Sequence, residues 1–196
     1  MDDDRETLID GFSAVVLAAG ISSRMGRNKL MMEIAGRAMI RHVVETARAV
    51  TDDVIVVTGH QAERVEEALS RSSPSFVRVD PTLGQSHSID AGVAASRAPL
   101  GTIVFVGDQP RLTEREIAAL TTAWLAGDRR KALVPVVGEA RGWPMIIPAG
   151  FPAGLDLSAP DVHDLHPDVV AVFSSKNPVY ASSVDTPEDW RSMFAI

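Results

Sequence analysis

A strand-like apolar run that leads into a charged, glycine-containing loop most constrains how this chain can fold. Residues 15–19 read Val-Val-Leu-Ala-Ala, and residues 20–29 contain two glycines, two serines, two arginines and a final lysine. Glycine and other small residues tolerate the backbone conformations in which several N–H groups point toward one place. Arg24 and Lys29 add positive charge to the same segment. The pattern predicts a strand whose end carries a binding loop for a triphosphate.

Two common phosphate-binding patterns do not describe this loop. Five residues separate Gly20 from Gly26, and Lys29 comes two positions later than the lysine of a Walker A loop. The dinucleotide-binding pattern G-x-G-x-x-G is also absent. The alternative, a tight strand-to-helix turn with incidental charges, does not require both glycines together with Arg24 and Lys29.

Length and charge narrow the class of protein. The 196 residues, 45% of them hydrophobic, suffice for one domain with a sizeable core. A net charge of −7 argues against nucleic acid or an anionic membrane surface as the main partner. The absence of cysteine excludes disulfides, thiolate metal ligands and a cysteine nucleophile. We expect a cytoplasmic protein with a flexible acidic tail over residues 1–10, which do not resemble a signal peptide, and one domain over residues 11–196.

Short β-rich runs alternate with longer helical segments, which is typical of a mainly parallel sheet covered by helices. The predicted strands are Ser13–Ala18, Val54–Thr58, Ser75–Val79, Thr102–Gly107, Ala132–Val137, Met145–Ile147 and Val169–Phe173. The predicted helices are Ala38–Ala49, Ala62–Ser70, Ser86–Ser96, Thr113–Leu125 and a last one that begins at Thr186. The α/β class follows from this alternation.

Turn and capping residues refine these boundaries. Residues 113–116 form a capping box, and residues 186–189 repeat its logic with proline at the first helical position. Prolines at positions 135, 144, 148, 152 and 160 predict that the fifth strand is interrupted and followed by an irregular lobe on the same core. Ligands of such sheets bind at the carboxyl ends of the strands, so we expect Gly20, Asp80 and Asp108 to converge.

Asp108 and Asp185 are the candidate metal ligands. Asp108 follows the buried run of residues 104–107, and Mg²⁺ prefers carboxylate and phosphate oxygens. Its alternative role is that of a turn residue before Pro110. Asp185 precedes the last helix, and its alternative role is to complement the positive end of that helix.

The loop matches the signature L-A-A-G-x-S-x-R-M-G-x-x-K, and the chain thereby resembles the MobA-like nucleotidyltransferases. Within that family it most resembles the molybdenum cofactor cytidylyltransferases (MocA-like). The resemblance is strong over residues 15–110, returns at 142–144 and 184–189, and fails between 155 and 165. It implies a single-domain, three-layer, Rossmann-like fold with a mainly parallel sheet.

The resemblance also implies roles for individual residues. Arg24, Lys29 and Asp108 would be catalytic, and Asp108 and Asp185 would bind Mg²⁺. The nucleotide would contact Leu17, Ala18, Ala19, Gly20, Ser22, Ser23, Arg24, Met25, Gly26, Lys29, Gly84, Ser86, Ser88 and Gly107. The acceptor would lie near Gln109, Gly142, Trp143 and Pro144.

Ala19 and Ser88 bear on the base. The resemblance implies that alanine at position 19 accompanies cytosine, whereas guanine-using relatives tend to carry glycine. A methyl group on the pocket wall crowds a purine more than a pyrimidine, which favours CTP over GTP. Ser88 is the better candidate for base contact, whereas Ser86 can also serve as an ordinary helix cap. His87 is not expected to be catalytic, because transfer to an anionic phosphate needs no general base.

The chain departs from its family on the acceptor side. Trp143 stands where relatives usually have histidine, and the element Gly-Asp-x-Gly-(Ala/Val)-Arg is replaced by residues 158–163. Trp143 could stack on a flat pterin-like ring or close an apolar lobe. The missing arginine removes an expected phosphate contact. The cluster of Asp161, His163, Asp164 and His166 is better explained as a solvated turn than as a metal site.

The expected function is therefore Mg²⁺-dependent transfer of CMP from CTP to a molybdopterin-type cofactor, with release of pyrophosphate and a molybdoenzyme as the final client. One alternative keeps the chemistry but takes a sugar or polyol phosphate as acceptor. Another is a non-catalytic cofactor-binding or delivery protein. Lys29, Asp108 and Asp185 speak against the non-catalytic alternative, whereas Trp143 and the missing arginine speak for it.

Overall fold

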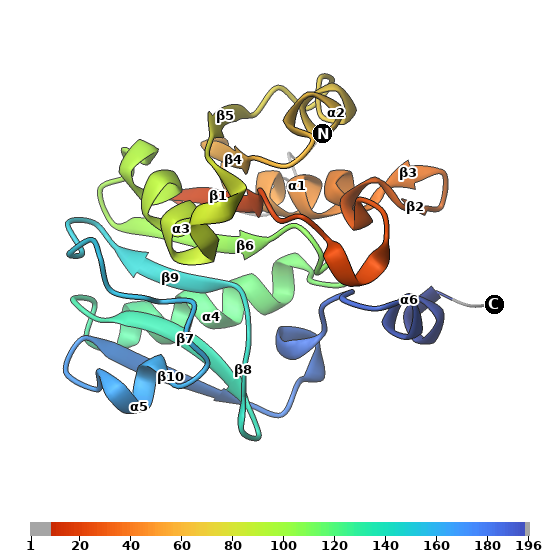
Figure 1. The fold of residues 1–196 in the computed structure, drawn as a ribbon. Coiled ribbons are helices and arrows are strands. Elements are labelled where there is room, and N and C mark those ends of the chain that lie inside the picture. Colours follow the sequence, from red (N-terminus) through yellow and green to blue (C-terminus); the bar gives the residue numbers. More distant parts are fainter. Residues whose placement is uncertain (1–8, 195–196) are drawn as a thin grey trace, which may run out of the picture.

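The computed structural model describes residues 9–194, apart from the side chains of Arg24 and Leu165. Its main sheet has eight strands in the order β10-β7-β9-β6-β1-β4-β5, with β8 paired to β7 (Figure 1). The strands are β1 Phe12–Ala18, β4 Val54–Thr58, β5 Ser75–Arg78, β6 Gly101–Val106, β7 Ala132–Val137, β8 Ala140–Arg141, β9 Met145–Pro148 and β10 Val170–Ser175. β1 runs parallel to β4 and β6, whereas β9 is antiparallel to β6 and β7.

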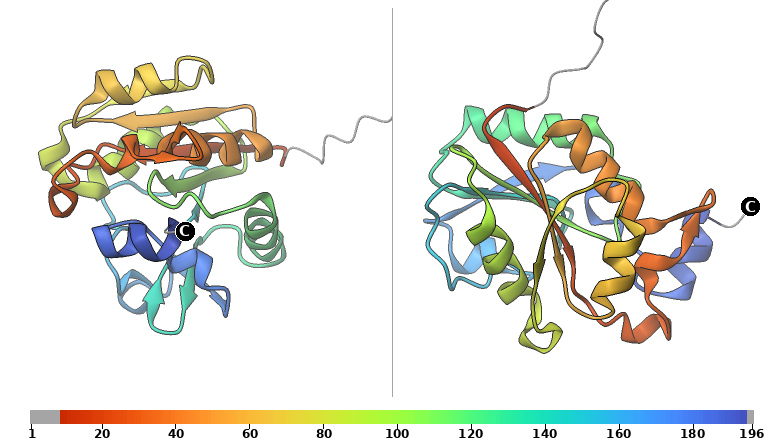
Figure 2. Two further views of the ribbon diagram at one scale, coloured as in Figure 1. Left: turned by 90° about the vertical axis from the view of Figure 1, so that its right-hand side faces the viewer. Right: turned by 90° about the horizontal axis from the view of Figure 1, so that it is seen from above.

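Helices cover both faces of this sheet. They are α1 Met39–Val50, α2 Ala62–Ala68, α3 Gly84–Ala95, α4 Glu114–Ala126, α5 Val162–Leu165 and α6 Pro187–Phe194. Four 3₁₀ turns, η1 Ser23–Met25, η2 Lys29–Met31, η3 Pro81–Leu83 and η4 Pro178–Ala181, and a hairpin of β2 Glu33–Ile34 with β3 Arg37–Ala38 complete the described elements. Figures 1 and 2 show α3 and α4 on opposite sides of the sheet.

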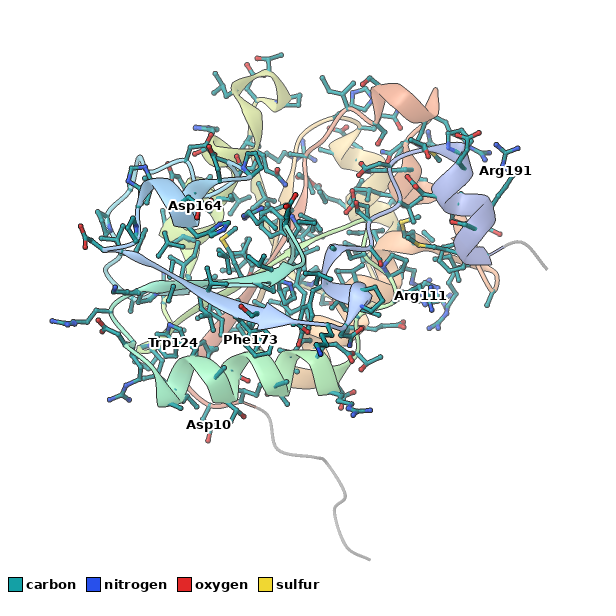
Figure 3. The ribbon with its side chains drawn as sticks, turned by 90° about the horizontal axis from the view of Figure 1, so that it is seen from below. Asp10, Arg111, Trp124, Asp164, Phe173 and Arg191 are labelled. Carbon is teal, nitrogen blue, oxygen red and sulfur yellow. The ribbon has the colours of Figure 1, made fainter. Side chains whose placement is uncertain are left out.

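Alternate side chains of β1 pack into two hydrophobic cores, one on each face of the sheet. Ala14 and Val16 pack toward α1 and α4, where Trp124 lies on the inner side of α4 (Figure 3). Val15 and Leu17 pack on the other face, toward α3 and α5. Gly92 lets α3 approach this face closely, because a Cβ at that position would lie 2.5 Å from Cγ1 of Val15. The central strands are therefore buried on both faces.

The predicted α/β class, the seven strands and the helices are confirmed, with boundaries that differ by at most two residues. Both capping boxes are present: the amide of Thr113 donates to Glu116 at 3.1 Å, and the amide of Thr186 donates to Asp189 at 2.7 Å. The hairpin β2–β3, β8 and α5 were not predicted, because two to four residues are too few to show a periodicity.

The predicted interruption of the fifth strand is wrong. β7 continues through Pro135, which lies beside Phe173 of β10. On its other edge β7 pairs with β9 at Leu133 and with β8 at Val136 and Val137, so pairing continues on both sides of Pro135. Of the predicted tail, residues 1–8 lie outside the described residues, and Ile9 donates its amide to the carbonyl of Val50 at 2.7 Å.

None of the helices in the described part of the chain combines the length and the apolar character that crossing a membrane would require.

Candidate active site

A pocket of about 320 Å³ opens at the carboxyl ends of β1 and β6. It gathers the end of β1, the following loop, the start of α3, the end of β6 and the segment before α6. Its wall is formed by Leu17, Ala18, Ala19, Gly20, Ser22, Ser23, Lys29, Leu30, Pro81, Gly84, Gln85, Ser88, Val106, Gly107, Asp108 and Asp185. Most of the residues predicted to contact the nucleotide or the metal therefore line one cavity.

The loop after β1 turns sharply at Ser22, which has a φ of 57°, and again at Gly26, which has a φ of 64°. The amide of Met25 donates to the carbonyl of Ser22 at 3.0 Å, and that of Gly26 donates to Ser23 at 3.4 Å. Met25 and Gly26 thus close the turn and are not part of the pocket wall. The loop presents Gly20, Ser22 and Ser23 to the cavity instead.

Lys29 is held by its backbone and reaches the cavity with its side chain. The side chain of Asn28 accepts a hydrogen bond from the amide of Leu30 at 3.1 Å and caps η2. The amide of Lys29 donates to the hydroxyl of Ser22 at 3.4 Å. The ammonium donates to the carboxylate of Asp108 and, at 2.9 Å, to Oδ1 of Asp185. One cation therefore bridges two carboxylates that lie 77 positions apart in the sequence.

Backbone contacts bring these two carboxylates together. The amide of Gly107 donates to the carbonyl of Leu17 at 2.9 Å, which fixes the end of β6 beside β1. The amide of Val184 donates to the carbonyl of Asp108 at 3.0 Å and so places Asp185 next to it. Asp189 accepts hydrogen bonds from the amides of Asp185 and Thr186 at the start of α6. Asp189 therefore caps this helix.

Burial and charge oppose each other in this cluster. The side chains of Lys29 and Asp108 are each 15% exposed, and that of Asp185 is 32% exposed. Burial alone lowers the pKa of Lys29, but the charges of Asp108 and Asp185 outweigh it and raise that pKa. Burial raises the pKa of Asp108, against the effect of Lys29. The ammonium therefore stays charged at neutral pH, next to a carboxylate that is poorly solvated.

The donor set of this cluster suits a hard divalent ion. Oδ1 of Asp108 is buried and has no hydrogen-bond partner among the described residues. Such an atom calls for an explanation, and a carboxylate oxygen on the wall of a pocket is an ordinary Mg²⁺ ligand. Among the described residues, no three or more His, Asp or Glu side chains lie close enough together to hold a metal ion. The side chains of residues 161–166 therefore do not form such a group.

Another part of the pocket wall comes from η3 and the start of α3. Ser88 is 5% exposed and donates to the carbonyl of Gly84 at 3.3 Å. Ser86 and His87 are absent from the pocket wall, whereas Gln85 and Pro81 belong to it. Asp80 was predicted to lie at this cavity but is not on its wall. Its carboxylate instead caps η3 and accepts a hydrogen bond from the amide of Thr82 at 2.9 Å. Pro81, the first residue of η3, takes its place on the wall.

The four predicted acceptor-side residues form a packed junction beside the pocket. The side-chain amide of Gln109 donates to the carbonyl of Tyr180 at 3.0 Å, and the amide of Trp143 donates to the same oxygen at 2.8 Å. Gly142 packs so closely there that a Cβ would lie 2.4 Å from this oxygen. None of Gln109, Gly142, Trp143 and Pro144 lines the pocket.

Trp143 is 9% exposed and belongs to the core on the α3 side of the sheet. The guanidinium carbon of Arg141 lies 4.2 Å from the centre of its ring. Arg141 donates to the carbonyl of Leu157 at 2.6 Å, and burial lowers the pKa of Arg141 to about 10. These contacts favour the second of the two roles considered for Trp143, that of closing an apolar lobe.

Comparison with known proteins agrees with this geometry. The MobA-like NTP transferase domain family matches residues 14–163. The bifunctional protein GlmU of Cupriavidus pinatubonensis is 36% identical over 125 residues, which cover 62% of this chain and 27% of that protein. The chain spans between 27% and 36% of the length of the GlmU proteins that it matches.

Two solved structures share the fold. A nucleotidyl transferase from Methanothermobacter thermautotroptrophicus has a TM-score of 0.79 and 26% identity, covering 93% of this chain and 95% of that one. The molybdopterin-guanine dinucleotide biosynthesis protein A of Archaeoglobus fulgidus has a TM-score of 0.65 and 17% identity, covering 93% and 96%. The chain therefore belongs to the MobA-like NTP transferase family and is a domain of the nucleotidyltransferase type.

Proposed function

We propose that this domain is a magnesium-dependent nucleotidyltransferase that transfers CMP from CTP to a phosphorylated acceptor and releases pyrophosphate. The observation that carries the proposal is one pocket in which the loop after β1, Lys29, Asp108 and Asp185 meet. A triphosphate needs backbone N–H donors, a fixed cation and a metal site within a few ångströms of one another. The family membership of the chain supports the same class of reaction.

The triphosphate would lie along the loop after β1. Gly20, Ser22 and Ser23 line this part of the pocket, and their amides and hydroxyls are suited to grip the β- and γ-phosphates. Lys29 reaches the same cavity from η2 and would stabilise the charge on the α-phosphate and the leaving pyrophosphate. Arg24, whose side chain lies outside the description, remains a predicted second cation.

Asp108 and Asp185 would hold the magnesium ion. The unpartnered Oδ1 of Asp108 supports this role, because a buried carboxylate oxygen without a donor is ready to accept a cation. When bound, Mg²⁺ supplies charge neutralisation for the phosphates. The backbone bond from Val184 to Asp108 keeps the two carboxylates in register.

The reaction would be an in-line displacement at phosphorus. An oxygen of the acceptor phosphate attacks the α-phosphorus of CTP, and the bond from this phosphorus to the bridging oxygen breaks to release pyrophosphate. The attacking phosphate is already ionised, so no general base is required, and none of the described wall residues is a histidine. The residues of this chain would act by positioning and by electrostatic stabilisation.

The base would lie against Ala19 and Ser88. Ala19 and Ser88 are 5% exposed and belong to the pocket wall, and the methyl group of Ala19 would limit the room for a base. A pyrimidine fits beside this methyl group with less crowding than a purine. We therefore propose CTP over GTP as the donor.

The acceptor we favour is a molybdopterin-type cofactor, which would place the domain in molybdenum cofactor biosynthesis. The name of the Archaeoglobus relative and the MocA-like signature of the loop support this choice. The buried ring of Trp143, with Arg141 over it, offers little surface for a flat pterin and favours testing a sugar or polyol phosphate alongside it.

Pyrophosphate release tests the proposal. The purified chain is incubated with CTP or GTP, Mg²⁺ and either molybdenum-loaded molybdopterin or a panel of sugar and polyol phosphates, and the products are weighed by mass spectrometry. We expect pyrophosphate and a cytidine diphosphate-linked product from CTP. CTP binding without release of pyrophosphate in the presence of any of these acceptors would favour the non-catalytic cofactor-binding alternative.

A further inference from the structure

The cation position between Asp108 and Asp185 is occupied by the chain itself. Oδ2 of Asp108 and Oδ1 of Asp185 both accept hydrogen bonds from the ammonium of Lys29. We propose that Lys29 competes with the divalent ion for this position, so that the metal binds well only when a nucleotide triphosphate draws the ammonium away. This inference rests on the proposed function and adds an order of binding to it.

The geometry makes the ammonium and the metal alternatives to each other. The side chains of Lys29 and Asp108 are each only 15% exposed, so solvent screens their charges poorly. A divalent ion placed on the same two carboxylates would lie against the ammonium, and like charges at that separation repel strongly in such surroundings. Oδ1 of Asp108 remains available, but a metal that uses both carboxylates binds well only if Lys29 leaves.

The side chain of Lys29 can move away from the two carboxylates without disturbing the fold. Its backbone is fixed by the hydroxyl of Ser22 and by the cap that Asn28 provides to η2. Its ammonium is a compact charge on a flexible stem and can exchange one set of oxygens for another, which the planar guanidinium of an arginine does less readily. The side chain alone can move.

The pocket offers the ammonium a second set of partners once a nucleotide enters. Gly20, Ser22 and Ser23, the proposed seat of the phosphates, share the cavity wall with Lys29 and Asp108. When a divalent ion takes the place of the ammonium on Asp108 and Asp185, the ammonium is released and can turn toward the phosphates. The triphosphate and the metal thus favour each other's binding through Lys29.

Metal binding to the nucleotide-free protein tests this order. Binding of Mn²⁺ alone is measured by electron paramagnetic resonance for the wild type, Lys29→Met, Lys29→Arg and the double variant Lys29→Met with Asp108→Asn. We expect Lys29→Met to bind Mn²⁺ roughly ten- to a hundredfold more tightly than the wild type, the factor that one charge-assisted hydrogen bond supplies. Lys29→Arg, which keeps the charge, should bind weakly, and the double variant should lose the gain.

A measurement on the wild type covers the case in which Lys29→Met fails to fold. The side-chain resonances of Lys29 are followed by nuclear magnetic resonance in protein labelled at lysine. They should shift on addition of Mg²⁺ with CTP and stay in place with Mg²⁺ alone.

Three results would overturn the inference: equal Mn²⁺ affinity of the wild type and Lys29→Met, no Mn²⁺ binding by either protein, or a Lys29 shift with Mg²⁺ alone. Pyrophosphate release by the wild type is scored separately. If release occurs, only the order of binding is wrong. If release is also absent, the proposed function fails with it.

Discussion

Two regions of the molecule each bury a basic side chain, and they do so in opposite ways. Lys29, beside the phosphate loop, is bonded to two carboxylates, whose charges raise its pKa. Arg141, beside Trp143, donates to a backbone carbonyl and stacks on an indole, and burial lowers its pKa to about 10. The first cation is bonded to charged groups, whereas the second is bonded to a backbone carbonyl and stacked on an aromatic ring.

The difference separates a site built for exchange from a site built for packing. Charged partners such as Asp108 and Asp185 can be taken over by an incoming cation, because the carboxylates remain when the ammonium leaves. The carbonyl of Leu157 and the ring of Trp143, which contact Arg141, carry no charge that an incoming cation could bind. These contacts hold the segment around Leu157 against β8 and β9. We therefore expect substitutions near Lys29 to change activity and substitutions near Arg141 to change mainly stability.

Asp108→Asn should have the largest effect and should act on turnover alone. Loss of the proposed metal ligand lowers kcat by roughly 10²–10³-fold, as removal of one strong electrostatic group from an active site does. Because burial raises the pKa of Asp108, a neutral amide of the same shape costs the fold little. Steady-state kinetics and thermal unfolding measure both quantities.

The matched control for this variant is Asp52→Asn, at an exposed carboxylate outside the pocket. It should leave kcat unchanged. Near-wild-type turnover by Asp108→Asn at saturating Mg²⁺ would contradict the proposal that Asp108 binds the catalytic metal.

Trp143→Ala should act on the other region and on stability. The ring is 9% exposed within a hydrophobic core, and large-to-small changes of buried aromatic residues cost about 3–5 kcal/mol of unfolding free energy. Trp190→Ala, on α6, where no residue is buried, should cost much less. Urea denaturation measures the loss. A stable Trp143→Ala protein with a raised KM for the acceptor would revive the stacking role.

Ala19→Gly should change the choice of nucleotide. Removing the methyl group from the pocket wall enlarges the base site, and one such group is worth about a tenfold change in selectivity. The ratio of CTP to GTP affinity, measured by calorimetric titration with Mg²⁺, should fall by that factor, whereas Ala94→Gly on the exposed side of α3 should leave it alone. Equal affinities for both nucleotides in the wild type would show that Ala19 does not select the base.

Arg141→Met should have the smallest effect. Methionine keeps much of the packing against Trp143, and replacing a buried charge by an apolar group of similar size is often neutral. The substitution leaves no buried carboxylate behind, because Asp156, the acidic residue that acts on Arg141, is exposed. The unfolding free energy should change by less than about 1 kcal/mol. A loss above about 3 kcal/mol would mean that the guanidinium itself holds the lobe together.

The two regions also differ in how far the sequence predicts them. The phosphate loop and Asp108 directly follow strands of buried apolar residues, so strand position and local motif agree, and the structure gathers them in one pocket. Met25 and Gly26 belong to the same motif, but their amides are consumed by the turn, which only the backbone geometry reveals.

The acceptor-side junction depends on contacts that no local pattern reports. Tyr180 accepts hydrogen bonds from both Gln109 and Trp143, and nothing in the sequence around it marks this role. The capping box between Thr186 and Asp189 at the start of α6 is, by contrast, contiguous, and the sequence predicts it. Motifs of neighbouring residues could be predicted because each lies in one stretch of sequence. The junction could not be predicted, since it is assembled from segments that are distant in the sequence.

A crystal structure with Mg²⁺ and the non-hydrolysable analogue α,β-methylene-CTP tests the central claim most directly. We predict that the phosphates lie against Gly20, Ser22 and Ser23, that Asp108 and Asp185 bind the metal, and that the ammonium of Lys29 contacts the phosphates. A nucleotide bound outside this pocket, or phosphates bound there with Lys29 still bridging Asp108 and Asp185, would contradict the account.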